Sequence, residues 1–299
     1  MNILITGGLG FIGAHLERRI KPEHNVFIVD RDRISRDNYY RGDICDYSRM
    51  EMIFSQVKPD IVLHLAAMVS RKECEETPYM AIQTNVDGTL NIILLCLKYK
   101  ARLIYAGSSE EYGTAFDNCI VNESIPFGEP TSIYSLTKRM SEEIIQYYAF
   151  FKGLKATTLR FFMLYGPGER PSDYRSAIIR FIDAAMKNEE LKVHKDTVRQ
   201  WCYIDDAVSG ILHIIERKQE KNYEDYNIGG QEVTATEDLA TLIIRLTGSQ
   251  SRINVIAPEE TIIPKKVADF SKMKNTFGWF AAIPLESGLL YVIKDFSNH

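Results

Sequence analysis

The first half of the chain alternates between short apolar runs and longer amphipathic stretches. Apolar runs of this length are typical of parallel strands that are buried on both faces. We predict such strands at Asn2–Thr6, Asn25–Asp30, Ile61–Ala66, Arg102–Ala106 and Ala156–Phe161. The amphipathic stretches predict helices at Gly13–Ile20, Tyr47–Gln56, Ala81–Tyr99 and Ile133–Lys152. This alternation predicts an α/β fold, a Rossmann-like doubly wound parallel sheet with helices on both faces.

The pattern loosens in the second half of the chain. Gly166–Asp173 is rich in Gly, Pro and charge, and it predicts a loop. Beyond it we predict three helices and one strand, at Ser176–Asn188, Leu191–His194 (the strand), Ala207–Arg217 and Thr236–Thr247. We therefore expect a Rossmann domain over residues 1–165, completed by parts of 200–230, and a smaller substrate domain over 166–299. The ligand cleft is expected between the two.

Composition narrows the class of protein. A chain of 299 residues with 45% hydrophobic residues can bury a large core, and its net charge of -4 argues against a nucleic-acid partner. None of the five cysteines forms a C-x-x-C pair, and no His or carboxylate cluster has metal-ligand spacing. No signal peptide and no apolar run of about 18 residues is recognised. We expect a cytoplasmic protein without a metal or a membrane partner. The aromatic stretch Tyr147–Phe151 is expected to be a buried helix face.

A glycine-rich segment follows the first predicted strand. The sequence ILITGGLGFIG places Gly7, Gly8, Gly10 and Gly13 between that strand and the first helix. Glycines at these places allow a tight turn, a close approach of the backbone to a pyrophosphate and close helix–strand packing. The helix N-terminus also favours an anion. The context predicts a dinucleotide site rather than an ordinary tight turn.

Asp30 ends the second predicted strand, close to the offset of about 20 residues at which an acidic residue binds ribose hydroxyls. Its carboxylate would repel a 2′-phosphate, which favours NAD as the cofactor. Arg31 and Arg33 follow directly and could pair with such a phosphate, so NADP remains the alternative.

Tyr134 and Lys138 lie four residues apart in a predicted helix and therefore share one face. A phenol with a pKa near 10 is a poor base at neutral pH. A nearby ammonium group and a nicotinamide cation would lower that pKa, so that Tyr134 could take a hydroxyl proton while hydride leaves the same carbon. Ser108 lies where a predicted strand ends, at the edge of the sheet where ligands bind. It could polarise the same substrate hydroxyl.

Taken together, these features resemble the extended short-chain dehydrogenase/reductases, in the nucleotide-sugar epimerase/dehydratase branch. The resemblance spans nearly the whole chain. It rests on TGGLGFIG at 6–13, Asp30, GDI at 42–44, HLAA at 64–67, Asn85, GSSEEYG at 107–113, YSLTK at 134–138, RFFMLYGPGERP at 160–171 and RQWCYIDDA at 199–207.

The resemblance implies roles for individual residues. The cofactor would be bound by Gly7, Gly10, Phe11, Ile12, Gly13 and Asp30, by Asp43 and Ile44 beside the adenine, by Leu65, Ala66 and Ala67 near the pyrophosphate, and by Tyr134 and Lys138. Ser108, Tyr134 and Lys138 match the catalytic triad. Ser109 would contact the substrate, and Arg199 would grip its diphosphate, as a guanidinium can do with two hydrogen bonds. A homodimer formed through helices at about 86–99 and 133–152 is also implied.

The sequence points to more than one reaction. Glu110 matches the glutamate base of sugar 4,6-dehydratases. Ser109, however, stands where the 4,6-dehydratases of the deoxythymidine type have an acidic residue. Serine followed by glutamate also resembles mannose dehydratases and glucuronate decarboxylases, and GSSEEYG resembles 4-keto-6-deoxy-sugar reductases. The segment at 168–185 resembles uridine-type 4-epimerases instead. Gln200 stands where many members have Asp.

We favour an NAD-dependent 4-epimerase of a nucleoside-diphosphate hexose or hexuronic acid, which acts through a 4-keto-sugar. The alternatives are a 4,6-dehydratase that uses Glu110, a reductase that uses exchangeable NAD(P)H, and a non-enzymatic dinucleotide-binding protein. The last should have lost Ser108, Tyr134 or Lys138, and all three are present.

Overall fold

The computed structural model describes residues 1–117, 119–169, 176–258 and 261–297 of the chain. Residues 170–173 of the predicted loop, and residues 170–175 of the segment 168–185, lie outside these ranges. The chain forms two compact units, each assembled from three stretches of sequence. Unit 1 contains residues 1–111, 132–160 and 211–226, and unit 2 contains residues 112–131, 161–210 and 227–299.

A seven-stranded sheet forms the centre of unit 1, with the strand order β11-β6-β5-β4-β1-β2-β3. Its strands are β1 (Asn2–Thr6), β2 (Asn25–Asp30), β3 (Tyr39–Arg41), β4 (Ile61–His64), β5 (Arg102–Ser108), β6 (Ala156–Phe161) and β11 (Tyr223–Ile228). The pairs from β3 to β5 are all parallel. The predicted Rossmann-like α/β class is confirmed.

Strand prediction succeeded where a strand is buried on both faces. β1, β2 and β6 have the predicted bounds. β4 ends two residues earlier than predicted, and β5 continues to Ser108. The short edge strand β3 was missed because its residues are exposed or half-buried and leave no apolar run.

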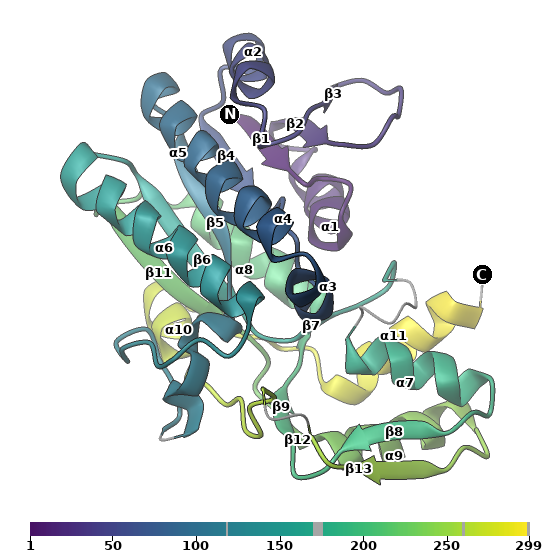
Figure 1. Cartoon of the computed structure of the whole chain (residues 1–299). Coiled ribbons are helices and arrows are strands. Elements are labelled where there is room, and N and C mark those ends of the chain that lie inside the picture. The colour runs from purple at the N-terminus through teal and green to yellow at the C-terminus, as the bar shows by residue number, and fades with distance from the viewer. Residues whose placement is uncertain (118, 170–175, 259–260, 298–299) are drawn as a thin grey trace. The chain divides into compact units, whose positions relative to one another are not determined.

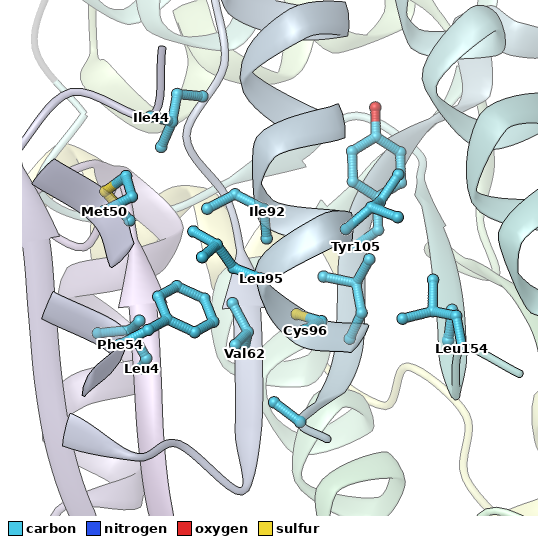
Figure 2. Close-up of a cluster of buried hydrophobic side chains, with 14 of the residues drawn as sticks. Leu4, Ile44, Met50, Phe54, Val62, Ile92, Leu95, Cys96, Tyr105 and Leu154 are labelled. Carbon is cyan, nitrogen blue, oxygen red and sulfur yellow. The ribbon is translucent and has the colours of Figure 1, made fainter. Parts of the chain in front are cut away.

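Three long helices cover one face of this sheet, and α5 packs against both of the others. They are α2 (Tyr47–Val57), α5 (Gly88–Tyr99) and α6 (Ile133–Lys152). Apolar side chains between these helices and the strands form one buried cluster, which includes Leu4, Phe54, Val62, Leu95 and Cys96 (Figure 2). Unit 1 also contains α1 (Phe11–Ile20) and α3 (Arg71–Glu76), and α8 (Ile204–Glu216) passes from unit 2 into unit 1 (Figure 1).

The predicted helix Ala81–Tyr99 is not one regular helix. It consists of α4 (Pro78–Ile82), a π-helical turn at Gln83–Asp87 and α5. Asn85 lies in that turn, and its amide exchanges two hydrogen bonds with the backbone of Met68, at 2.8 and 3.0 Å. Pro78–Tyr99 is long and apolar enough by composition to cross a membrane, although it contains no continuous apolar run of about 18 residues. Half of that apolar window is buried inside the protein, as in a core helix.

Three of the four aromatic residues of the stretch 147–151 are exposed, contrary to prediction, while Tyr148 is half-buried against the core. Tyr147, Phe150 and Phe151 are 51%, 61% and 72% exposed. The face of α6 that packs on α5 and β5 instead carries mostly small and polar residues, namely Ser135, Thr137, Lys138, Ser141, Glu142, Ile145 and Ala149. The bulky side chains therefore lie on the outer face.

Unit 2 combines short strand pairs with helices. Its elements, with the turn at Ser109–Asp117 that begins in unit 1, are β7 (Leu164–Tyr165), α7 (Ala177–Met186), β8 (Leu191–His194), β9 (Val198–Gln200), β10 (Cys202–Tyr203), β12 (Val233–Ala235), α9 (Thr236–Thr247), β13 (Ile253–Ile256), α10 (Ser271–Phe277) and α11 (Leu285–Ser297). β8 pairs with β13, β9 with β12 and β7 with β10. An aromatic cluster around Tyr112, Phe162 and Phe270 forms part of its core.

Candidate active site

The glycine-rich segment forms a tight connection from β1 to α1. Gly7 has a φ of 67°, and a Cβ atom there would lie 2.7 Å from the Ala66 backbone. A Cβ atom on Gly13 would lie 2.6 Å from Gly8. Helix α1 begins after Gly10, has no side-chain cap at its N-terminus and carries no acidic residue in its first turn. Its first N–H groups are therefore suited to an anionic group such as a pyrophosphate.

The carboxylate of Asp30 lies beside this segment. One oxygen accepts a hydrogen bond from the Leu9 N–H at 3.0 Å, and the other accepts from the Arg31 N–H at 2.8 Å. Both bonds hold the carboxylate at the carboxyl end of β2, next to the loop that follows β1. This is where a ribose that continues from the pyrophosphate would reach it. Arg31 and Arg33 are exposed.

The other predicted cofactor residues are also in unit 1. Leu65, Ala66 and Ala67 follow β4 and are half-buried, and the Leu65 N–H donates to the Thr6 carbonyl at 3.1 Å. The Asp43 carboxylate accepts from the Cys45 N–H at 2.9 Å. Ile44 is buried in the cluster of Figure 2, so most of its side chain packs inside the protein. Phe11 and Ile12 are half-buried in the first turn of α1.

Lys138 lies on α6 and reaches the strand that carries Ser108. Its Nζ donates to the Ala106 carbonyl of β5 at 2.6 Å and lies 4.4 Å from the centre of the Tyr105 ring. Burial lowers the pKa of Lys138 to about 8. The ammonium form therefore still predominates at neutral pH.

Ser108 and Tyr134 are brought together, one from the end of β5 and the other from the start of α6. The Ser108 hydroxyl oxygen accepts from the Glu110 N–H at 3.2 Å, so its own proton is left to donate. Burial raises the pKa of Tyr134 well above its ordinary value and the Glu110 carboxylate adds to this, while a hydrogen bond with Ser108 lowers it in part. In the chain without its cofactor, Lys138 therefore does not lower the pKa of Tyr134 below its ordinary value. A cationic nicotinamide would add the missing positive charge when bound.

Glu110 and Ser109 are buried beside this pair. The backbone carbonyl of Glu110 accepts from the Ser135 hydroxyl at 2.8 Å, which ties the exit of β5 to the first turn of α6. Ser132 caps that turn by accepting from the Ser135 N–H at 3.1 Å. Ser108, Glu110, Tyr134 and Lys138 therefore form one cluster within unit 1.

Arg199 belongs to β9 in unit 2. One terminal nitrogen of its guanidinium donates to the carbonyls of Val198 and Pro264, at 2.8 and 2.7 Å. The neighbouring Gln200 is buried, and its side-chain oxygen accepts from the Ala268 N–H at 2.7 Å. The amide thus supports the local backbone at the position where many relatives have Asp.

Sequence reasoning missed a charged cluster behind Ser108. Glu111, Glu142 and Arg160 are almost fully buried and come from the turn after β5, from α6 and from β6. The signals were an arginine in the middle of an apolar strand and a glutamate one turn beyond Lys138. Neither signal specifies a partner.

His64 lies in a second buried network, between β1 and α5. Its Nδ1 is 2.7 Å from the Thr6 hydroxyl, and its Nε2 is 3.0 Å from the Thr89 hydroxyl. The Thr89 hydroxyl donates to the Asn85 carbonyl at 2.5 Å, so it accepts from Nε2–H, and Nδ1 accepts from Thr6. Burial, followed by the charge of Lys138, lowers the pKa of His64 to about 3.

We expect this histidine to make the protein less stable in acid. The unfolded chain takes up a proton near pH 6.5 and the folded chain only near pH 3, so stability is full above pH 6.5 and falls as the pH drops toward 3. The loss is about 1.4 kcal/mol per pH unit in that window. Urea unfolding at pH 7 and pH 5 measures it. The variant His64→Gln should show a smaller pH dependence, and equal slopes for the two proteins would contradict the assignment.

Residues 3–229 match the NAD dependent epimerase/dehydratase family. The chain belongs to this family. A UDP-N-acetyl-alpha-D-glucosaminuronate decarboxylase of Bacillus cytotoxicus is 33% identical, over 98% of this chain and 97% of that protein.

Two solved structures have the same fold over nearly their whole length. The UDP-glucose 4-epimerase of Thermotoga maritima, solved with UDP-glucose, is 29% identical with a TM-score of 0.90, over 100% of this chain and 99% of that one. MoeE5 in complex with UDP-glucuronic acid and NAD is 25% identical with a TM-score of 0.89, over the same shares. Like its relatives, this member of the family is an NAD-dependent enzyme that modifies a nucleotide-sugar.

Proposed function

We propose that the protein is an NAD-dependent 4-epimerase of a nucleoside-diphosphate hexose or hexuronic acid. The observation that carries the proposal is the cluster of Ser108, Tyr134 and Lys138, in which Lys138 is anchored on the strand that carries Ser108. It places a proton acceptor, a hydroxyl donor and a cation at the carboxyl edge of the sheet, where ligands of such folds bind.

Each residue of the cluster has a role in the proposed reaction. Tyr134 takes the proton of the sugar C4 hydroxyl, while the Ser108 hydroxyl donates to the same C4 oxygen. Lys138 stabilises the phenolate of Tyr134 with its charge. NAD, when bound, supplies the acceptor for the C4 hydride and then the donor that returns it to the other face of the 4-keto-sugar. Tyr134 returns the proton to the C4 oxygen in that second half.

The residues that would hold NAD are those of the glycine-rich segment and Asp30. The N–H groups at the start of α1 would bind the pyrophosphate, and the Asp30 carboxylate would accept hydrogen bonds from the ribose hydroxyls. A carboxylate at this place disfavours the 2′-phosphate of NADP. Leu65, Ala66, Ala67, Asp43 and Ile44 would line the rest of the cofactor site.

Arg199 would bind the diphosphate of the substrate. We expect Arg199→Ala to weaken the binding of UDP by about 1.5–3 kcal/mol, the scale of hydrogen bonds to charged groups. Titration calorimetry with UDP and with NAD measures it, and NAD affinity should stay unchanged. The exposed Arg252→Ala is the matched control. A loss of NAD affinity in Arg199→Ala would move this arginine to the cofactor site.

A second candidate is decarboxylation of a nucleoside-diphosphate hexuronic acid. It is favoured by the 33% identity to a decarboxylase over almost the whole chain, and it begins with the same oxidation at C4. A 4,6-dehydratase is not favoured, because Ser109 is a weaker proton donor for the C6 hydroxyl than a carboxylic acid.

Turnover in deuterium oxide separates the reactions. The pure protein is incubated with UDP-glucose, UDP-glucuronic acid and UDP-N-acetylglucosaminuronic acid, and the products are identified by mass and NMR. A 4-epimerase gives a product of unchanged mass without deuterium at C5. Loss of carbon dioxide with deuterium at C5 would establish the decarboxylase. Loss of water with deuterium at C5 would establish the dehydratase.

We also propose a homodimer in the cytoplasm, with contacts through the outer faces of α6 and of α4, which replaces the predicted segment 86–99 because most residues of that segment are buried or half-buried. These helices pack together and expose a set of apolar side chains, namely Tyr79, Met80, Ile82, Leu136, Tyr147, Phe150 and Phe151. A large exposed apolar patch is typical of a protein interface. Sedimentation of the wild type and of Phe151→Glu measures it, and a monomeric wild type would contradict it.

A further inference from the structure

The buried charged cluster behind Ser108 has more acid than base. The carboxylates of Glu111, Glu142 and Asp225 face the guanidinium of Arg160. Arg160 donates to Glu142 through two nitrogens, one of them at 3.0 Å, and to Asp225 at 2.9 Å. The nearest oxygen of Glu111 is 3.6 Å from Arg160, beyond hydrogen-bonding distance. Of the three carboxylates, Glu111 therefore interacts least with the guanidinium of Arg160.

The charge balance shows which acid keeps its proton. Three ionised carboxylates beside the two cations Arg160 and Lys138 would still leave excess negative charge in the interior, which is costly. Burial alone would raise the pKa of Glu142, but Arg160 and a hydrogen bond from Tyr223 lower it below the ordinary value. Burial, the charge of Glu142 and a hydrogen bond between the Glu111 and Glu142 carboxyl groups raise the pKa of Glu111 well above its ordinary value. These two directions, together with the closer contacts of Arg160 to Glu142, favour a proton on Glu111 rather than on Glu142.

Glu111 also contacts the catalytic strand directly. Its Oε1 accepts from the Ser108 N–H at 2.7 Å, inside the protein. This bond fixes the backbone at Ser108, where β5 ends and the turn at Ser109–Asp117 begins. The titratable and charged groups that face Glu111 are Tyr105 on β5, Arg160 on β6, and Tyr134, Lys138 and Glu142 on α6.

We propose that Glu111 is a positioning residue that works as a neutral carboxylic acid: it accepts from the Ser108 N–H and shares its proton with Glu142. The proposal rests on the proposed function, since it assigns Glu111 a part in placing Ser108 for that reaction. Neutrality matters because an ionised Glu111 would oppose the phenolate of Tyr134 and strengthen the hold of Lys138 on its own proton. The acid form supports the turn without adding a charge against either group.

Two variants test the proposal. Glu111→Gln keeps the shape, the neutral charge, a carbonyl acceptor for Ser108 and a donor for Glu142. Glu111→Leu keeps the volume but removes both hydrogen bonds. We expect Glu111→Leu to lose kcat roughly ten- to a hundredfold with little change in KM, because Ser108 is displaced. Glu111→Gln should keep most of the wild-type kcat, and the acidic limb of its pH profile should coincide with that of the wild type. Equal losses in both variants, or a shifted acidic limb in Glu111→Gln, would overturn the proposal.

Two further measurements need no turnover, so they separate this proposal from the proposed function. The infrared spectrum at neutral pH should contain a carbonyl band of a protonated carboxylic acid that is absent from Glu111→Gln and Glu111→Leu. Hydrogen exchange of the Ser108 amide should be protected in the wild type and in Glu111→Gln, and faster in Glu111→Leu. If the wild type lacks the band, or if Ser108 exchanges equally in all three proteins, Glu111 does not act in this way, whatever the reaction.

Discussion

The variant Tyr134→Phe is expected to keep its fold and its dinucleotide but to lose about 10²–10⁴-fold in turnover, the scale of a general acid–base group. The substitution removes one oxygen, the atom that takes and returns the C4 proton in the proposed reaction. The ring stays, so the packing at the start of α6 should change little. Steady-state kinetics on the substrate found in the deuterium experiment measures the effect.

A matched control lies on the same helix. Tyr147 is exposed near the other end of α6, and Tyr147→Phe removes the same oxygen far from Ser108. It should keep wild-type turnover. If Tyr134→Phe also stayed within a few-fold of the wild type, another group would be the proton acceptor.

Replacing Arg160 by leucine should destabilise the protein by about 3–5 kcal/mol, the usual cost of removing one partner of a buried ion pair. Glu142 and Asp225 would keep their charges in the interior without the guanidinium that now serves both. Urea unfolding measures the change through the midpoint, provided that the slope is unchanged.

Arg139→Leu is the control for this loss. Arg139 also lies in unit 1 and pairs with a carboxylate, that of Glu143, one helical turn away at the surface of α6. Such exposed pairs contribute about 0.3–0.5 kcal/mol. A similar small effect for Arg160→Leu would mean that the buried carboxylates take up protons at little cost, and the charge balance argued for Glu111 would fail with it.

The sequence was sufficient for the parts of the fold that repeat a local rule. β1, β2, β6 and α6 were predicted within their bounds because a buried strand needs a continuous apolar run and a helix needs a periodic one. The π-helical turn at Gln83–Asp87 was not predictable in this way. Its partner is the backbone of Met68, and no local pattern encodes that pairing.

The candidate site likewise has residues that a local motif predicts and residues that only the packed structure reveals. Ser108, Tyr134 and Lys138 were found because each stands in a motif, and the parallel sheet brings the ends of its strands together. The pKa of Tyr134 was expected to be lowered by an ammonium group and a nicotinamide cation together; burial, which spacing on a helix does not reveal, raises it in the chain without the cofactor. Glu111 was passed over beside Glu110 because its neighbours come from α6 and β6. Only the packed structure brings these acids to one arginine.

The late position of β11 in the chain has a consequence for biosynthesis. The backbones of 156 and 162 donate hydrogen bonds to those of 222 and 228, so β6 gains its outer neighbour only when β11 has left the ribosome. Until then the nascent chain presents the unpaired edge of a fully buried strand, the kind of edge at which chains associate wrongly. All of residues 161–210 must be made in that interval. Slow folding through a partly built sheet, with a need for chaperones during synthesis, is the expected behaviour of such a topology.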